Sequence, residues 1–135
     1  HNVPTADRAY LVNRVAAEKY PDVKFTAFGG LCLNHPVGGL NPDAVETSLK
    51  LGAKVIWLPT NTAENHYRKN GKDPSKGVVV TRDGKAVDEL QDIFSLVKQY
   101  NAVLATGHIG AEECFPVVEL PVPQAHSHTF PRGIP

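Results

Sequence analysis

Three short runs of consecutive apolar residues constrain the fold of this chain most strongly. The clearest is residues 54–60 (KVIWLPT), and residues 25–33 (FTAFGGLCL) and 102–106 (AVLAT) share its character. A strand with one face in water alternates apolar and polar residues, whereas a parallel strand covered by helices is apolar throughout. The runs therefore predict buried strands of a parallel sheet.

Helical patterns separate and follow these runs, at residues 4–20, 41–52, 88–100 and 111–119. The second has the clearest ends, because Asn41 is a good N-cap and Gly52 suits the C-terminal end. Pro116 is expected to interrupt the last one. Strands that alternate with helices favour a parallel sheet with right-handed crossovers. We therefore expect an α/β domain over residues 1–119, followed by a Pro-rich tail over residues 120–135.

Two further segments lie between the second strand and the third helix. Residues 61–76 (NTAENHYRKNGKDPSK) are polar and predict a long loop or lid. Residues 77–81 and 85–87 flank Arg82-Asp83-Gly84, which predicts a small hairpin.

Polar residues follow each predicted strand. His35 and His108 come after the first and third strands, and Thr60 and Asn61 end the second. In parallel α/β folds the ligand site lies beyond the carboxyl ends of the strands. Imidazole binds metals and transfers protons near neutral pH, so His35 and His108 are the candidate catalytic residues. The alternative is that each histidine packs against or caps a neighbouring helix.

Four other histidines complete the candidate set. His126 and His128 form a His-x-His, which on a strand would direct both side chains to one metal ion; within a tail they carry no such role. His1 offers an α-amino group and an imidazole as ligands, unless this end is frayed. His66 lies in the polar loop, where it is either solvated or faces substrate. The candidate substrate-binding residues are Asn34, Thr60, Asn61 and His66.

Composition excludes several classes of protein. The 14 acidic and 14 basic residues balance, and no long block of like charge is present. This argues against binding to nucleic acid or to an anionic membrane. No apolar run approaches the ~20 residues of a membrane span, and the first residues lack a signal-peptide pattern. Cys32 and Cys114 are far apart in sequence and predict reduced, buried thiols in a cytoplasmic protein.

Three segments carry a resemblance to a known family. They are PTADRAYLV, GGLCLNHPVGGLNPDAVETSLKLGAKVIWLPT and AVLATGHIGAEE, and together they cover about residues 4–113. Their motifs NH-x-VGGLNP, W-x-PT and LATGH resemble those of a family of predicted metal-dependent hydrolases of the amidohydrolase type. The resemblance implies a TIM-like (β/α) barrel with a metal site at the carboxyl ends of its strands.

The resemblance also implies which residues hold the metal. His35 and His108 match strand-end histidines of that family, and His1 matches a histidine that ends a preceding strand. The family's opening His-x-His strand and its later ligand strands are absent at the expected places, although His126 and His128 faintly resemble the opening motif. Because a closed barrel needs eight strands, we expect a partial barrel and a partial chain.

Three functions are compatible with these residues. In the first, a divalent metal, expected to be zinc, is held by His35 and His108 with His1, His126 or His128, and activates water to hydrolyse an amide, ester or related bond of a small molecule. In the second, the chain is a non-catalytic half-barrel, a binding or assembly module that forms a homo-oligomer to cover its sheet edge. In the third, the histidines act as acid and base without metal.

Overall fold

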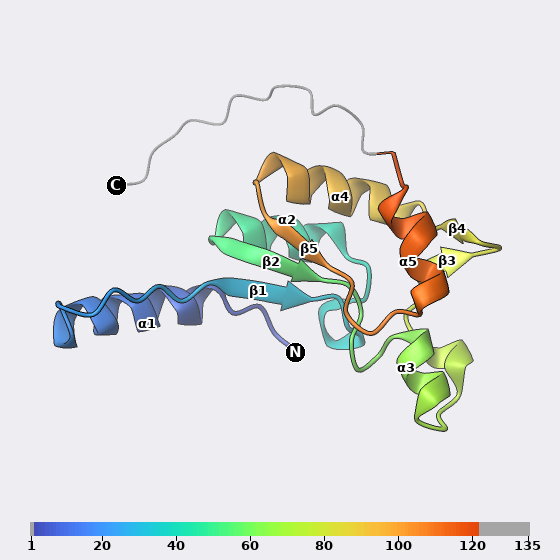
Figure 1. Cartoon of the computed structure of the whole chain (residues 1–135), viewed down its shortest axis with the longest axis horizontal. Coiled ribbons are helices and arrows are strands. Elements are labelled where there is room, and N and C mark those ends of the chain that lie inside the picture. Colours follow the sequence, from blue (N-terminus) through green and yellow to red (C-terminus); the bar gives the residue numbers. More distant parts are fainter. Residues whose placement is uncertain (1, 122–135) are drawn as a thin grey trace.

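A computed structural model describes residues 2–121 of the chain (Figure 1). The elements run in the order α1 (Ala6–Lys19), β1 (Gly29–Cys32), η1 (His35–Val37), α2 (Pro42–Lys50), β2 (Ala53–Trp57), α3 (Glu64–Lys69), η2 (Pro74–Lys76), β3 (Thr81–Arg82), β4 (Lys85–Ala86), α4 (Glu89–Gln99), β5 (Val103–Ala105) and α5 (Ala111–Val118).

The three predicted strands form one sheet in the order β1-β2-β5, and both pairings are parallel. Gly30 pairs with Val55, and Val55 with Val103, so these residues form one row across the sheet. The next row consists of Leu31, Ile56 and Leu104. The predicted α/β class with a parallel sheet and alternating helices is therefore confirmed.

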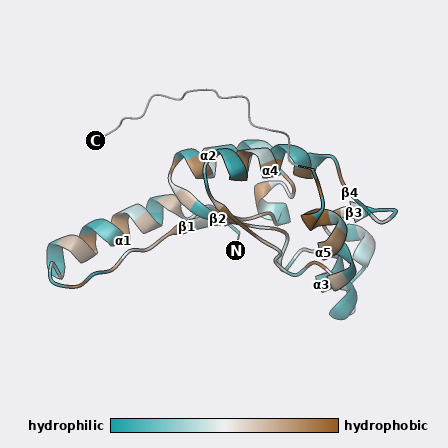
Figure 2. Ribbon diagram, turned by 45° about the horizontal axis from the view of Figure 1, so that its top comes forward, coloured by the Kyte–Doolittle hydropathy of each residue, from teal (hydrophilic) through white to brown (hydrophobic). Residues whose placement is uncertain are grey.

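One face of the sheet holds the core. Helices α2 and α4 lie on this face (Figure 2), and the row of Leu31 and Ile56 beneath them is almost completely buried. Leu49 of α2 and Ile93 of α4 belong to the same cluster. Burial of each such side chain stabilises the fold by about 1.5–3 kcal/mol. The capped start of α2 is also as expected, because the Asn41 side chain accepts a hydrogen bond from the Ala44 N–H at 3.2 Å.

The opposite face of the sheet is open. Trp57 is 43% exposed and Val103 is 60% exposed. Both belong to rows that alternate along the strands with the buried row of Leu31 and Ile56, so they lie on the opposite face. The helices of residues 2–121 leave these side chains uncovered, because α2 and α4 lie on the same side of the sheet. The expectation of strands buried on both faces is therefore correct for one face only.

Helix α1 extends away from the sheet (Figure 1). It is anchored at its start, where the Thr5 hydroxyl donates to the Gly30 carbonyl at 3.1 Å and accepts from the Gly30 N–H at 2.9 Å. Ala6 is its only buried residue. The apolar residues whose spacing predicts this helix, such as Leu11 and Val15, face away from the core.

The polar segment 61–76 is more ordered than a loop. It contains α3, in which Glu64 and Arg68 form an ion pair one turn apart, and η2, where the Asp73 side chain accepts from the Ser75 N–H. Short local contacts of this kind build helical turns without any apolar periodicity. The expectation of a plain loop or lid is therefore corrected.

Two other local expectations can be compared with the structure. The hairpin is confirmed as β3 and β4, with Asp83 and Gly84 at φ 51° and 72° in the turn between them. Pro116 does not interrupt α5, which continues to Val118. A proline in a helix removes one backbone hydrogen bond, and here the helix ends soon after it.

Some expectations concern the outer parts of the chain. Residues 122–135, which include most of the expected tail, lie outside the described residues. Within residues 2–121, no helix has the length and apolar character needed to span a bilayer.

The contact between α1 and the sheet gives a first prediction. A Cβ added at Gly29 would lie 2.4 Å from the Ala6 Cα atom, so Gly29→Ala should force α1 away from β1. We expect a loss of about 1–3 kcal/mol in unfolding free energy, as for overpacked sites, measured by urea denaturation. Gly71→Ala is the control, because nothing lies within 4 Å of its added Cβ and only its backbone (φ 66°) is strained. A smaller loss for Gly29→Ala than for Gly71→Ala would contradict this packing.

Candidate functional site

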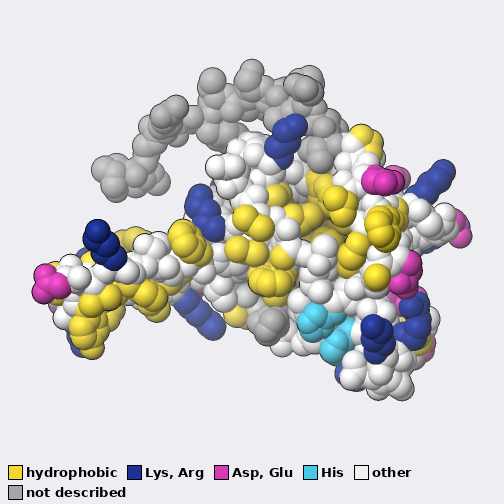
Figure 3. All heavy atoms as spheres, in the orientation of Figure 1, with side chains coloured by type: hydrophobic (Ala, Val, Ile, Leu, Met, Phe, Trp, Pro, Cys, Tyr) yellow, Lys and Arg dark blue, Asp and Glu magenta, His cyan; other side chains and the backbone are white. Residues whose placement is uncertain are grey.

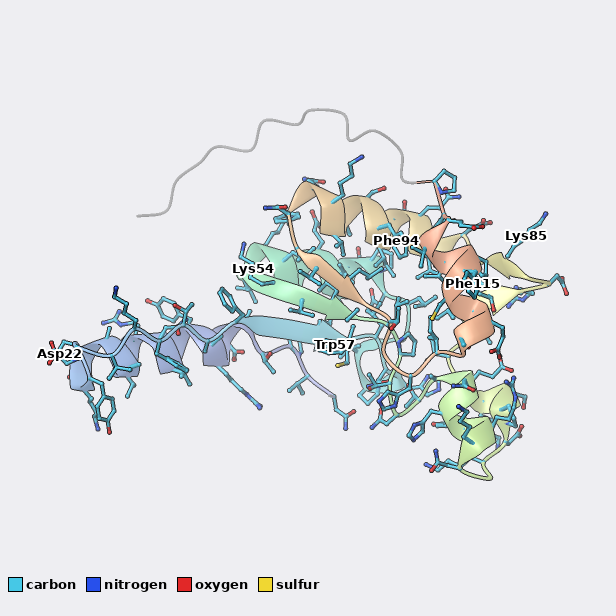
Figure 4. The ribbon with its side chains drawn as sticks, in the orientation of Figure 1. Asp22, Lys54, Trp57, Lys85, Phe94 and Phe115 are labelled. Carbon is cyan, nitrogen blue, oxygen red and sulfur yellow. The ribbon has the colours of Figure 1, made fainter. Side chains whose placement is uncertain are left out.

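The candidate site lies at the carboxyl edge of the sheet. Because the strands are parallel, the segments that follow β1, β2 and β5 reach this edge together. They carry Asn34 and His35, then Thr60, and then His108. Lys54 lies at the opposite end of β2, as expected from its place in the strand (Figure 4).

A buried amide joins two of these segments. Asn34 is 0% exposed, and its side-chain oxygen accepts from the Thr60 N–H at 2.9 Å, the Thr62 N–H at 3.3 Å and the Thr62 hydroxyl at 2.9 Å. Its side-chain nitrogen donates to the Thr60 hydroxyl at 2.8 Å. Asn34 therefore binds the end of β1 to the chain after β2. Thr60, at 3% exposed, is part of the same network.

Close backbone packing positions His108. The His108 N–H donates to the Pro59 carbonyl at 2.9 Å, and the Asn65 amide donates to the His108 carbonyl at 3.0 Å. Gly107 has a φ of 64°, and a Cβ there would lie 2.4 Å from the Leu58 carbonyl oxygen. Only glycine fits this approach, which holds the β5 segment against the β2 segment.

His66 and His108 form a close pair. Their Nδ1 atoms lie 3.1 Å apart, and their rings are stacked with centroids 5.0 Å apart. Two nitrogen lone pairs at this distance repel each other unless a proton or a cation lies between them. The contact is therefore either a hydrogen bond, with the Nδ1–H of one ring donating to the Nδ1 of the other, or a place for a cation between the two nitrogens.

His35 has different partners. Its Nε2 atom lies 2.8 Å from the Lys76 carbonyl oxygen, and its ring centroid lies 6.5 Å from that of Tyr67. Because a carbonyl only accepts hydrogen bonds, Nε2 carries the hydrogen in this contact. Sequence reasoning paired His35 with His108, whereas the structure pairs His66 with His108.

Larger ligand clusters are not present in this part of the chain. Among residues 2–121, no three His, Cys, Asp or Glu side chains are grouped so that they could hold one metal ion. His1, His126 and His128, the other expected ligands, lie outside the described residues. Asn61 is exposed at the same edge, in a position open to a ligand.

The surroundings of the histidines are basic. Figure 3 shows histidine side chains at the surface beside Lys and Arg. The Lys72 ammonium lies 5.2 Å from the Tyr67 ring centroid, and Glu64 is neutralised by Arg68. The Glu113 carboxylate accepts from the Gly110 N–H at 2.5 Å, so it caps α5 as expected of an acidic first-turn residue.

Sequence reasoning missed two residues of this site. Gly107 directly precedes His108, and a glycine at the end of a predicted strand could have indicated a close backbone approach there. Asn65 lies in the polar segment next to His66, and no local pattern distinguishes it from the other polar residues there. Both act through contacts with residues far away in the sequence.

Cys32 lies in the strand beside this site and is buried, as expected, while Cys114 is partly exposed. Neither cysteine forms a disulfide. Burial raises the pKa of the Cys32 thiol, because a low-dielectric surrounding disfavours the thiolate.

The fold and the site define an α/β protein with a histidine pair at the carboxyl edge of a parallel sheet. Residues 1–124 match a family described as "Family of unknown function (DUF6282)", and the chain belongs to this family. No curated protein matches the chain, and no solved structure matches it.

The Asn34 network gives a second prediction. Asn34→Ala leaves the buried Thr60 N–H and its neighbours without their acceptor, so we expect a loss of about 3 kcal/mol in unfolding free energy. Asn61→Ala is the matched control, and as an exposed substitution it should change that free energy by no more than about 0.5 kcal/mol. If urea denaturation gives the same change in unfolding free energy for both substitutions, the hydrogen bonds of the Asn34 amide do not stabilise the fold as proposed.

The thiols give a third prediction. Iodoacetamide at pH 8 should alkylate Cys114 first, because the raised pKa and the burial of Cys32 limit its thiolate. In urea, both residues should react. Peptide mass spectrometry measures the order of labelling, and early modification of Cys32 in the folded protein would contradict the pKa direction.

Proposed function

We propose that this chain is a metal-dependent hydrolase of the amidohydrolase type, which acts on an amide, ester or related bond of a small molecule. One observation carries the proposal: two imidazole nitrogens, His66 Nδ1 and His108 Nδ1, lie 3.1 Å apart at the carboxyl edge of a parallel sheet. Helices and strands of this order are also what a part of a TIM-like barrel contains.

The donor set fits a divalent ion such as zinc. Zinc–nitrogen bonds of ~2.0–2.1 Å in tetrahedral geometry place two ligand nitrogens about 3.3 Å apart. The separation of 3.1 Å is close to this value. His66 and His108 would therefore supply two ligands of the ion, and a tetrahedral site needs further ligands besides these two.

The surrounding residues have separate roles in this proposal. A bound divalent ion supplies a Lewis acid and activates water near neutral pH. Gly107 and Asn65 hold His108 in place through its backbone. Because Nε2 of His35 carries the hydrogen bonded to Lys76, Nδ1 is the basic nitrogen of the neutral ring and can accept a proton.

Substrate and location follow from the same site. Asn61 is exposed at the edge and offers its amide to a small substrate. The neighbouring Thr60 is buried and holds this segment in place through its hydrogen bonds with Asn34. Two cysteines that form no disulfide are typical of a reducing compartment, so we propose the cytoplasm as the location of the enzyme.

Metal content tests the proposal directly. We expect purified protein to bind at least one equivalent of zinc or cobalt(II), measured by elemental analysis and by the cobalt absorption spectrum. His66→Ala and His108→Ala should each lose this binding. His35→Ala is the matched control: it should keep the metal but hydrolyse p-nitrophenyl acetate about a hundredfold more slowly, because it removes only the proton acceptor.

The contrary result has a clear meaning. Protein that takes up no zinc or cobalt at stoichiometric level would refute the metal site. The pair would then be a hydrogen bond from the Nδ1–H of one ring to the bare Nδ1 of the other. The non-catalytic binding or assembly module would become the favoured function.

A further inference from the structure

The uncovered face of the sheet is an extended apolar surface. It contains the rows Gly30–Val55–Val103 and Cys32–Trp57–Ala105. Phe28 is 66% exposed beside them. A depression of about 320 Å³ on this face is lined by Phe28, Val55 and Trp57, among others. In Figure 3 hydrophobic side chains gather on this face of the molecule.

Helix α1 carries a second apolar surface. Leu11, Val12, Val15 and Tyr20 lie along it, each between 47% and 62% exposed. Together with Ala16 they line a shallow groove, in which the only polar side-chain group among residues 2–121 is the Tyr20 hydroxyl. The helix is thus amphipathic, but its own sheet does not use the apolar side.

Neither surface is typical of a free monomer. Sheets whose strands are all parallel occur almost only with both faces covered. An aromatic side chain has roughly 150–250 Å² of surface. The two surfaces together expose on the order of 800 Å² of apolar area. Each partner of a standard protein interface contributes about this area. Something therefore covers them.

We propose that a second copy of this chain covers them, with α1 of each copy lying on the open sheet face of the other. The chain itself supplies both halves of a helix-on-sheet contact. Its own α1 cannot reach its own face, because the Thr5–Gly30 hydrogen bonds and the Gly29–Ala6 contact fix the helix at the edge of β1, directed outward. A two-fold axis makes the contact twice, as in an isologous dimer. This dimer does not depend on the proposed hydrolase activity.

Trp57 reports on this contact, because it is the only tryptophan in the chain and lies on the open face. We expect the native mass, measured by light scattering during size-exclusion chromatography at micromolar concentration, to be that of a dimer. Dilution or Val15→Glu should give monomers and shift the Trp57 emission to longer wavelength. Circular dichroism confirms that the variant keeps its helices.

A matched control distinguishes a specific contact through this surface from non-specific hydrophobic association. Leu51 at the end of α2 is 59% exposed, as apolar as Val15 and away from both surfaces, so Leu51→Glu should remain a dimer with unchanged emission. The proposal is overturned by a monomeric wild-type chain, by a dimer that survives both Val15→Glu and Leu11→Glu, or by equal dissociation of the Leu51 variant.

Discussion

The candidate site depends on one buried side chain, the amide of Asn34. It accepts three hydrogen bonds from Thr60 and Thr62, and so it joins the segment after β1 to the segment after β2. Without a partner, a buried amide and the donors facing it would each destabilise the fold. The third segment is held by backbone packing at Gly107. The backbone of the sheet edge is therefore fixed next to His108. His66 lies beside His108 and belongs to α3.

The two faces of the sheet differ in burial. Leu31 and Ile56 lie in a packed core beneath helices, whereas Trp57 and Val103 on the other face are exposed in the single chain. The site is at the edge between them, and its histidine pair comes from α3 and from the segment after β5. The proposed assembly through that face and the proposed chemistry at that edge therefore use different side chains of the same fold.

Most of the fold could be predicted from the sequence, because its signals are local. The apolar run ending in Trp57 predicts β2, and Asn41 predicts the start of α2. The same reasoning failed for α3, whose turns rest on the Glu64–Arg68 pair and not on apolar periodicity. It also placed His35 beside His108, because both follow strands. Strand ends share an edge, but the direction of each loop decides which side chains meet.

The sequence by itself determined the class of fold, the strand order along the chain and the edge at which polar residues gather, because hydrophobic periodicity and capping act over a few residues. Only the tertiary structure decided that His66 meets His108, 42 residues away. It also decided that one sheet face stays open, since that depends on which side the helices cross. Such outcomes arise from packing between distant segments, which no local pattern encodes.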